Sequence, residues 1–201
     1  MKRFALLLFL AACGTPYKHN EQCAAGEFER DSQEFAEPRN DIPGLPNLAR
    51  VSPALYRSAQ PTAEGFAEAK KLGIKTILNI RWGSSDRDEL KGLGLQYFHI
   101  SFSALNPEDS DVIAFLQVVQ DPANHPVLVH CQRGADRTGM MVAIYRHMVQ
   151  GWPMVRAKKE LPRFGFDPMF ENLIDYLDCL NCPQMRERVK AAPPPKIEFI
   201  P

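Results

Sequence analysis

The sequence predicts an α/β domain with a mainly parallel central sheet flanked by helices. Three observations lead to this prediction. Short apolar and β-branched runs alternate with helical patterns along the middle of the chain. The run Val127–His130 is nearly all apolar, which is typical of a strand buried at the centre of a sheet. The chain has 201 residues, 45% of them hydrophobic, and this suits one core of ordinary size.

The expected elements follow one another between residues 54 and 180. Strands are predicted where apolar and β-branched residues cluster, at 54–57, 75–80, 96–100 and 127–130. The first helix is predicted over 62–72, because Thr62 is a good N-terminal cap and Gly73 a good stop. Apolar periodicity and boundary residues predict the other helices, at 86–93, 109–120, 140–150, 155–161 and 168–180.

The N-terminus reads as a targeting segment. Lys2 and Arg3 precede an apolar run over 4–12, which is too short for a bilayer span of about 20 residues but suits a secretory signal. The run ends in Leu-Ala-Ala-Cys-Gly, which resembles a bacterial lipobox. The resemblance implies cleavage before Cys13 and lipidation of Cys13, and Gly14 then favours the outer membrane; the alternative is a plain signal peptide followed by a coincidental cysteine.

Composition divides the chain into four parts. We expect a signal peptide at 1–12, a polar flexible tether at 13–45, one folded domain at 46–182 and a Pro-rich tail at 183–201. Three consecutive prolines, 193–195, indicate an extended tail. Whether the apolar residues after them dock on the domain stays open at this point.

Charge and cysteine content exclude several classes of protein. The chain has 24 Lys and Arg against 24 Asp and Glu, so it lacks the basic excess of a nucleic-acid-binding protein. The spacing of Cys179 and Cys182 allows a local disulfide, a disulfide of one of them with Cys23, or unbridged packing. No second cysteine pair or histidine cluster accompanies them, so we expect no metal and no cofactor.

The chemistry is expected in the segment His-Cys-Gln-Arg-Gly-Ala-Asp-Arg-Thr-Gly, residues 130–139. A loop that leaves a strand and enters a helix directs backbone N–H groups at one spot, where the helix dipole is positive. Gly134 allows a tight turn, and Arg137 can return to the loop as a two-pronged phosphate donor. The predicted phosphate-binding residues are Gln132, Arg133, Gly134, Ala135, Asp136 and Arg137.

The same electric field acts on Cys131. Cysteines at helix N-termini beside cations are mostly thiolate at neutral pH. We therefore predict that Cys131 attacks phosphorus and that Arg137 stabilises the transition state. The hydroxyl of Thr138 is expected to donate to the thiolate, and His130 to fix the loop by hydrogen bonding.

Residues 130–139 match the HCxxGxxRTG signature of the protein tyrosine phosphatase superfamily, in its atypical dual-specificity-like branch. The stretches 55–61 and 74–81 and the Gly151–Trp152 turn also resemble bacterial periplasmic and plant–fungal members of that branch. The resemblance covers roughly residues 46–180. It implies the cysteine phosphatase fold and a metal-independent phosphomonoesterase.

The sequence departs from the family pattern at the general acid, the residue that protonates the leaving oxygen. The resemblance implies an Asp some 27–32 residues before the cysteine, but His99 to Ala104 contains no carboxylate. Asp109 is the first candidate, Asp136 inside the loop the second and Glu108 the third. The competing interpretation of Asp109 is a helix N-cap, which its place before an amphipathic run favours equally.

Three functions fit these residues. The first is an exported, lipid-anchored tyrosine or dual-specificity phosphatase that forms a phosphocysteine. The second keeps this mechanism but acts on an inositol polyphosphate, as in the tyrosine-phosphatase-like phytases, and it requires a basic rim. Arg133, Arg57, Arg81 and Lys158 are candidates for that rim, although Arg57 and Arg81 at strand ends are more often ion-pair partners of Asp or Glu. The third is a phosphate-binding module without turnover. The expected partners are a phosphorylated substrate, and a periplasmic membrane through the lipid anchor only.

Overall fold

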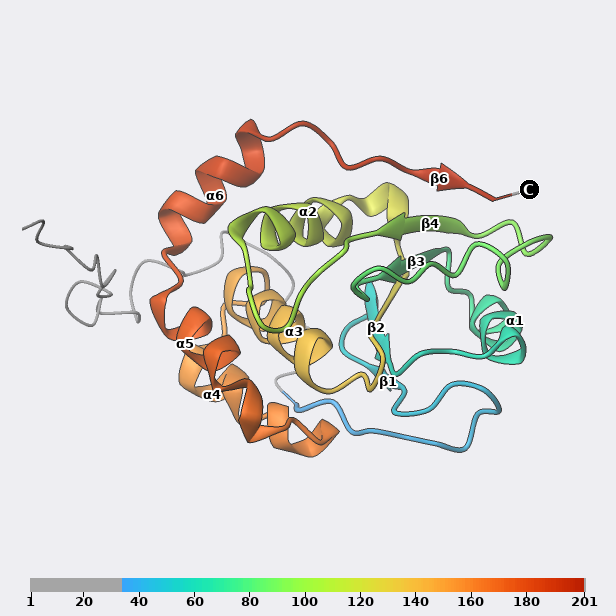
Figure 1. Ribbon diagram of the computed structural model, residues 1–201, viewed down its shortest axis with the longest axis horizontal. Coiled ribbons are helices and arrows are strands. Elements are labelled where there is room, and N and C mark those ends of the chain that lie inside the picture. Colours follow the sequence, from blue (N-terminus) through green and yellow to red (C-terminus); the bar gives the residue numbers. More distant parts are fainter. Residues whose placement is uncertain (1–33, 201) are drawn as a thin grey trace, which may run out of the picture.

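The computed structural model describes residues 34–200, so the signal segment, Cys13 and Cys23 lie outside the described residues. Six strands form one sheet in the order β1-β2-β5-β3-β4-β6, and the four central strands are parallel (Figure 1). The two edge strands, β1 and β6, are antiparallel to their neighbours. The strands are β1 Ala49–Arg50, β2 Leu55–Ser58, β3 Thr76–Asn79, β4 Gln96–His99, β5 Val127–His130 and β6 Glu198–Phe199. The predicted α/β fold with a mainly parallel sheet is confirmed.

Helices cover both faces of the sheet. One face is covered by α1, and the other by α2 to α6. The helices are α1 Ala63–Lys71, α2 Asp109–Gln120, α3 Asp136–Met148, α4 Met154–Lys158, α5 Glu171–Cys179 and α6 Cys182–Ala191. Between residues 34 and 200, none of them combines the length and apolar character that crossing a bilayer requires.

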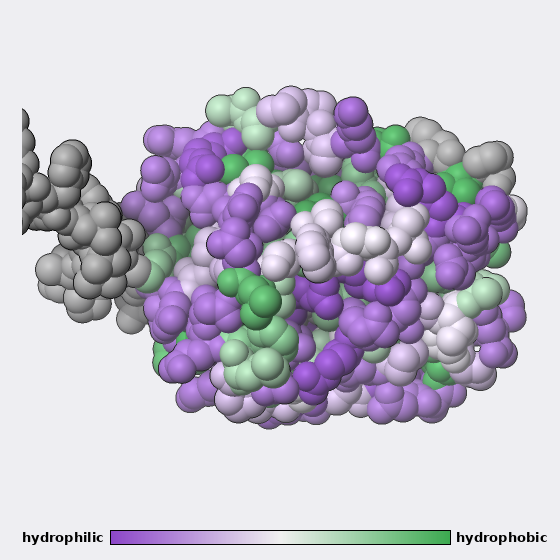
Figure 2. Space-filling model, in the orientation of Figure 1, coloured by the Kyte–Doolittle hydropathy of each residue, from purple (hydrophilic) through white to green (hydrophobic). Residues whose placement is uncertain are grey.

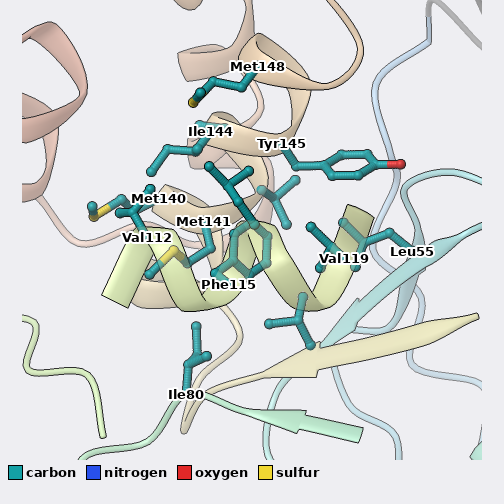
Figure 3. Close-up of a cluster of buried hydrophobic side chains, with 14 of the residues drawn as sticks. Leu55, Ile80, Val112, Phe115, Val119, Met140, Met141, Ile144, Tyr145 and Met148 are labelled. Carbon is teal, nitrogen blue, oxygen red and sulfur yellow. The ribbon is translucent and has the colours of Figure 1, made fainter. Parts of the chain in front are cut away.

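The central strands are buried on both faces, and their side chains alternate between two cores. In β5, Val127 and Val129 join the larger core, whereas Leu128 packs in the smaller core with Phe66 of α1. Figure 3 shows how apolar side chains of α2 and α3, including Phe115 and Met141, fill the larger core beside the sheet. This packing fixes where β5 ends and α3 begins.

Sequence signals place most helix boundaries correctly. The Thr62 hydroxyl accepts from the Gly65 N–H, and α1 ends before Gly73, which has a φ of +84°. The helix predicted over 109–120 coincides with α2. The helix predicted from 140 begins earlier, at Asp136, because the phosphate-loop motif already forms its first turn.

The helix predicted over 86–93 is wrong; this segment consists of turns. Gly92, inside the segment, has a positive φ, which an α-helix cannot accommodate. The N–H of Asp86 donates to the Tyr97 hydroxyl, so the start of the segment is held by tertiary contacts.

Ordered structure also extends past the predicted domain limits of 46 and 182. On the N-terminal side, Leu45 is completely buried and Arg39 bridges to Leu48. On the C-terminal side, α6 packs against α2, and β6 then pairs with β4. The residues after the prolines therefore dock on the domain, which the sequence left open.

Cys179 ends α5 and Cys182 begins α6, and both are disulfide-bonded. The unbridged alternative is thereby excluded for these two residues. Among the described residues, Cys131 is a free cysteine.

Candidate active site

The predicted phosphate loop, residues 131–135, joins the carboxyl end of β5 to the start of α3. We call this segment the P-loop. Its nucleophile candidate, Cys131, is buried, with 1% of its surface exposed. Gly134 has a φ of +68°, and a Cβ there would lie 2.5 Å from the backbone nitrogen of Ala59. The close contact with the segment after β2 therefore requires glycine at this position.

The P-loop carbonyls are held away from the loop interior. The carbonyl of Gln132 accepts from the N–H of Gln60 at 3.2 Å. The carbonyl of Arg133 accepts from the amide of Asn47 at 3.1 Å, and that of Gly134 from Nη2 of Arg57 at 2.8 Å. In a trans peptide the C=O and N–H point in opposite directions. The N–H groups of residues 133 to 135 are therefore turned inward, toward the concave side of the loop.

Arg137 and Thr138 follow in the first turn of α3. Nη1 of Arg137 lies 3.5 Å from the carbonyl of Phe102, in the loop that joins β4 to α2. The Thr138 hydroxyl is buried and has no hydrogen-bond partner among residues 34–200, so its donation to the Cys131 sulfur stays a prediction. The inward N–H groups, the start of α3 and Arg137 are the kinds of group that an anion site requires, and they lie in the same strand–loop–helix segment as Cys131.

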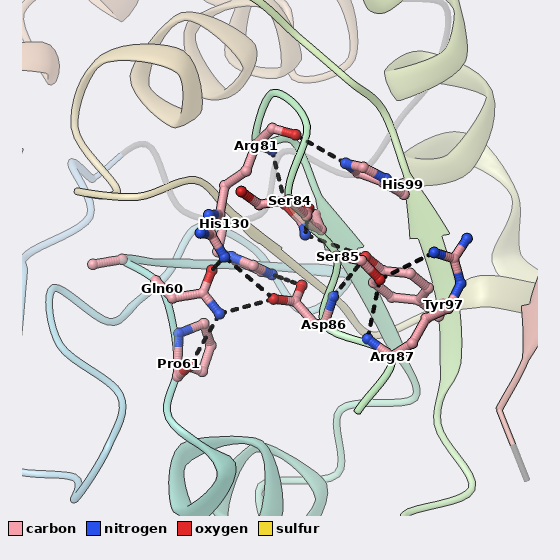
Figure 4. Close-up of polar contacts among 12 residues, drawn as sticks. Gln60, Pro61, Arg81, Ser84, Ser85, Asp86, Arg87, Tyr97, His99 and His130 are labelled. Atoms are coloured by element: carbon pink, nitrogen blue, oxygen red, sulfur yellow. Dashed lines mark hydrogen bonds and ion pairs between the residues drawn. The ribbon is translucent and has the colours of Figure 1, made fainter. Parts of the chain in front are cut away.

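His130 is held by a buried carboxylate that sequence reasoning missed. Nε2 of His130 lies 3.1 Å from Oδ2 of Asp86, and neither side chain reaches solvent (Figure 4). The other oxygen of Asp86 accepts from the amide of Gln60 at 2.8 Å and lies 3.6 Å from Arg81. Burial raises the pKa of Asp86, but hydrogen bonds and charges from His130, Gln60 and Arg81 outweigh it and hold that pKa below its usual value. The pair anchors the end of β5 to the segment after β3.

The outer side of the P-loop is tied to the segment after α4. Oδ1 of Asp136 accepts from the N–H of Asp167 at 2.9 Å. Arg133 is half exposed; its guanidinium donates to the carbonyl of Gly165 and lies 3.5 Å from Asp167 and 3.7 Å from Asp136. Gln132 is exposed. The structure therefore places Asp136 in a structural contact beside the loop.

The other acid candidates, Asp109 and Glu108, have hydrogen-bond partners outside the P-loop. Asp109 accepts from the Tyr176 hydroxyl at 2.5 Å and pairs with Arg188, so it bridges α2 to α5 and α6. Burial and the Asp109 hydrogen bond raise the pKa of Tyr176. Glu108 is the N-cap residue of α2 and accepts from Asn106 and Ser110. The N-cap role that the sequence suggested for Asp109 thus belongs to Glu108.

The rim candidates divide into two groups. Arg57 is completely buried and lies 3.8 Å from Glu160, and Arg81 pairs with Asp86, so both have the ion-pair role that strand-end arginines usually have. Lys158 pairs with Asp178 on α5. Arg133 remains as the exposed guanidinium inside the loop.

The sequence and the fold can now be compared with known proteins. The profile of the tyrosine phosphatase family matches residues 44–191. The dual specificity protein phosphatase TpbA of Pseudomonas aeruginosa is 37% identical over 121 residues, which cover 60% of this chain and 55% of TpbA. The inositol diphosphatase DSP5 of Arabidopsis thaliana is 33% identical over 116 residues, which cover 53% of this chain and 56% of DSP5.

Both matches span about half the length of these curated relatives. In the structural comparison, a crystal structure of P. aeruginosa TpbA superimposes with a TM-score of 0.68 at 30% identity, over 79% of this chain and 98% of that one. The family profile covers well over half of the chain and includes the P-loop, strand β5 that leads into it and strand β2 beside it. The chain belongs to the tyrosine phosphatase family.

Proposed function

We propose that this protein is a cysteine-dependent phosphatase that works through a phosphocysteine intermediate. The observation that carries the proposal is the P-loop itself. Cys131 lies in the floor of a loop whose carbonyls at 132, 133 and 134 are all hydrogen-bonded to groups outside it. The inward N–H groups and Arg137 are then available to bind the equatorial oxygens of a phosphoryl group.

The reaction has two displacements at phosphorus. In the first, the Cys131 thiolate forms an S–P bond as the bond from phosphorus to the leaving oxygen breaks. In the second, water attacks phosphorus, the S–P bond breaks, and inorganic phosphate leaves as the thiolate is regenerated. Thr138 supports the second step, because a hydroxyl donor stabilises the departing sulfur.

The leaving oxygen needs a proton, and the loop beside Arg137 contains no carboxylic acid that could donate it. The loop over Arg137, residues 101–107, contains no Asp or Glu. Asp136 and Asp109 remain the proposed donors, but each is already engaged, with Asp167 and with Tyr176 and Arg188. We therefore expect the enzyme to favour substrates whose leaving groups require little protonation.

A phosphotyrosyl protein is the first substrate that meets this expectation, since a phenolate is a better leaving group than an alkoxide. The structure of a Cys-to-Ser form of TpbA holds phosphotyrosine, which supports this class. Three large apolar side chains, Trp82, Leu105 and Met169, are exposed on the segments after β3, β4 and α4. Figure 2 shows an apolar patch over the loop between β4 and α2 on an otherwise largely hydrophilic face. These exposed apolar side chains are the contacts that we propose for the aryl group of a peptide substrate.

An inositol phosphate is the second candidate substrate. Relatives from Arabidopsis and yeast are named inositol diphosphatases. A diphosphate also has a good leaving group, namely phosphate, so the missing carboxylate at 101–107 favours it as well. Arg133 is the rim candidate whose guanidinium is half exposed, and we propose it as the contact for a second phosphate, in exchange for its pairing with Asp167.

We also propose that the protein is exported to the periplasm and held at a membrane, most simply the outer membrane, by lipid on Cys13. The sequence 1–14 supports this, with its basic start, short apolar run and lipobox-like end. Metabolic labelling with a palmitate analogue, compared between the wild type and Cys13→Ala, tests it. The wild type should be labelled and the variant should not.

The function is tested by phosphate release from four substrates in parallel: a phosphotyrosine peptide, p-nitrophenyl phosphate, inositol hexakisphosphate and an inositol diphosphate. Cys131→Ser is the blank. Release that depends on Cys131 supports the proposal, and the preferred substrate separates the two classes. Binding of phosphate without Cys131-dependent release from any of the four would favour a binding module and overturn it.

A further inference from the structure

The guanidinium of Arg57 is buried directly behind the P-loop. Arg57 lies in β2, opposite Val129 of β5, and none of its surface reaches solvent. Its Nη2 donates to the carbonyl of Gly134 at 2.8 Å, and its Cζ lies 3.5 Å from the centre of the Phe164 ring. A Cβ built on Gly139 would lie 3.8 Å from the same Nη2, so the charge sits beside the first turn of α3.

This buried cation has only a partial counter-charge. Glu160 lies 3.8 Å from Nη1 of Arg57, but its other oxygen accepts from Nε of Arg146 at 2.9 Å. Two buried guanidinium groups thus share one buried carboxylate. Within residues 34–200, Nε of Arg57 and Oε1 of Glu160 have no hydrogen-bond partner. Buried charges are costly when they are not balanced, so a further negative charge near Arg57 is stabilised.

Cys131 is the group that can supply such a charge when its sulfur is ionised, because Arg57 pairs with Val129 in the strand that leads into the P-loop and donates to the Gly134 carbonyl of the same loop. Burial lowers the pKa of Arg57 to about 10, while the negative charges of Glu160 and Cys131 raise it. The attraction is reciprocal, so the positive charge of Arg57 favours the ionised sulfur by the same free energy. Burial strengthens the effect, because charges inside a protein are weakly screened.

We propose that Arg57 is a positioning residue with two roles: it holds the Gly134–Ala135 peptide with its N–H inward, and its charge stabilises the Cys131 thiolate from behind. Glu160 opposes the second role of Arg57, because the Glu160 carboxylate reduces the positive charge that the sulfur experiences. The inference rests on the proposed phosphatase function, for which a thiolate and an inward N–H are required.

Other charged groups lie in the P-loop or on the elements beside it. They are Arg137 and Asp136 at the start of α3, Arg133 in the loop, and His130 with its partner Asp86. These groups are unchanged in variants of Arg57 and Glu160. A difference between such variants therefore reports on the buried cluster alone.

The test is the rate at which iodoacetamide alkylates Cys131 in the full chain as a function of pH, followed by mass spectrometry of the Cys131 peptide. Arg57→Met should move the midpoint of this profile upward by about one pH unit, because a buried positive charge is lost. Glu160→Gln should move it downward by about half a unit, since Arg57 is then less neutralised. A merely structural role would move both profiles in the same direction, because both variants loosen the same cluster.

Arg57→Lys separates the charge from the hydrogen bond. Lysine keeps the positive charge but lacks the rigid fork that reaches Gly134. We expect an alkylation midpoint within about 0.3 units of the wild type, together with a KM for p-nitrophenyl phosphate raised by roughly tenfold. Circular dichroism and thermal unfolding check that each variant folds; if Arg57→Met does not fold, Arg57→Lys and Glu160→Gln still carry the test.

An unchanged midpoint in folded Arg57→Met, or an upward shift in Glu160→Gln, would overturn the inference. Alkylation requires no turnover, so this result is independent of whether any phosphate ester is hydrolysed. Failure of the proposed function would appear instead as phosphate release that persists in Cys131→Ser or is absent from the wild type.

Discussion

The P-loop and the loop between β4 and α2 meet at Arg137, but the fold supports them very differently. Groups from two other segments hold the P-loop carbonyls, namely Asn47, and Arg57 with the N–H of Gln60 in and just after β2. The loop at 101–107 is contacted by Gly83 at Ser101, by Arg137 at Phe102 and by Asn172 at Ala104; Phe102 is buried, but Leu105 is 77% exposed. The proposed phosphate binding and nucleophilic attack thus use a loop whose carbonyls at 132 to 134 are all hydrogen-bonded, whereas the loop over Arg137 has no carboxylate to protonate the leaving group.

The largest effect is expected from substitution of Arg137, the bidentate donor that follows the P-loop. Arg137→Lys keeps a positive charge but loses the planar fork, so kcat/KM for p-nitrophenyl phosphate should fall by about 10²–10³-fold. The matched control is Arg133→Lys, since Arg133 is half exposed and engaged with Asp167. The control should lose no more than about threefold. Equal losses in both variants would show that Arg137 has no special place at the site.

A second change strains the support of the P-loop. Gly134→Ala places a Cβ 2.5 Å from the backbone of Ala59 at a φ of +68°. We expect the free energy of unfolding in urea to fall by about 2–4 kcal/mol. Gly83→Ala, at a φ of +66° with nothing within 4 Å of its Cβ, should cost only about 1 kcal/mol. If the two costs are the same, the contact between Gly134 and the segment after β2 is not rigid.

A third change adds a carboxylate to the loop between β4 and α2 and tests for a gain of activity. Ala104 lies in the loop that contacts Arg137, and it falls in the window where the family resemblance places the general acid. Ala104→Asp should raise kcat on a phosphoserine peptide by about tenfold, because an alkoxide needs a proton, and should change p-nitrophenyl phosphate turnover little. Ala104→Asn is the control of matched size and should gain nothing. A gain in neither or in both variants would mean that the loop does not reach the leaving group.

The smallest effect is on the pH dependence of stability and concerns Asp111 in the first turn of α2, the helix that follows the loop at 101–107. Burial raises the pKa of Asp111 to about 6, while the hydrogen bond from the Glu108 N–H opposes the shift. A raised folded-state pKa gives stability that is fully present below pH 4 and is lost as the pH rises through 6. Asp111→Asn should therefore remove a decline of about 1–2 kcal/mol between pH 4 and 7.

Urea unfolding across this pH range measures the effect, with the exposed Asp175→Asn on α5 as control. The control should retain the decline. If Asp111→Asn retains it as well, Asp111 does not cause it.

The parts of the site that were predicted from the sequence are local in the chain. Cys131, Gly134, Arg137 and Thr138 are brought together by one strand–loop–helix turn, so their spacing alone predicts the arrangement. The supports of that loop come from distant segments. The residues next to Asp86 in the sequence do not indicate that it contacts His130. The residues next to Glu160 do not indicate that it lies beside Arg57.

Two errors in the predicted fold have simple physical causes. Residues 183–201 were predicted as an extended tail from the three prolines at 193–195, but those prolines lie after α6, and Pro183 occupies the first turn of that helix, where proline is tolerated. The segment 86–93 contains helix-forming residues, but Gly92 at positive φ and the tertiary role of Asp86 override that propensity. In both places position within an element mattered more than composition.

The most direct test of the account is to trap the phosphocysteine. The full chain is mixed with p-nitrophenyl phosphate, quenched within the first turnovers, and digested for mass spectrometry under conditions that preserve thiophosphate esters. The account predicts a phosphoryl group on the peptide that carries Cys131, and none in Cys131→Ser. A phosphoryl group on another residue, or release of phosphate by Cys131→Ser at the wild-type rate, would contradict it.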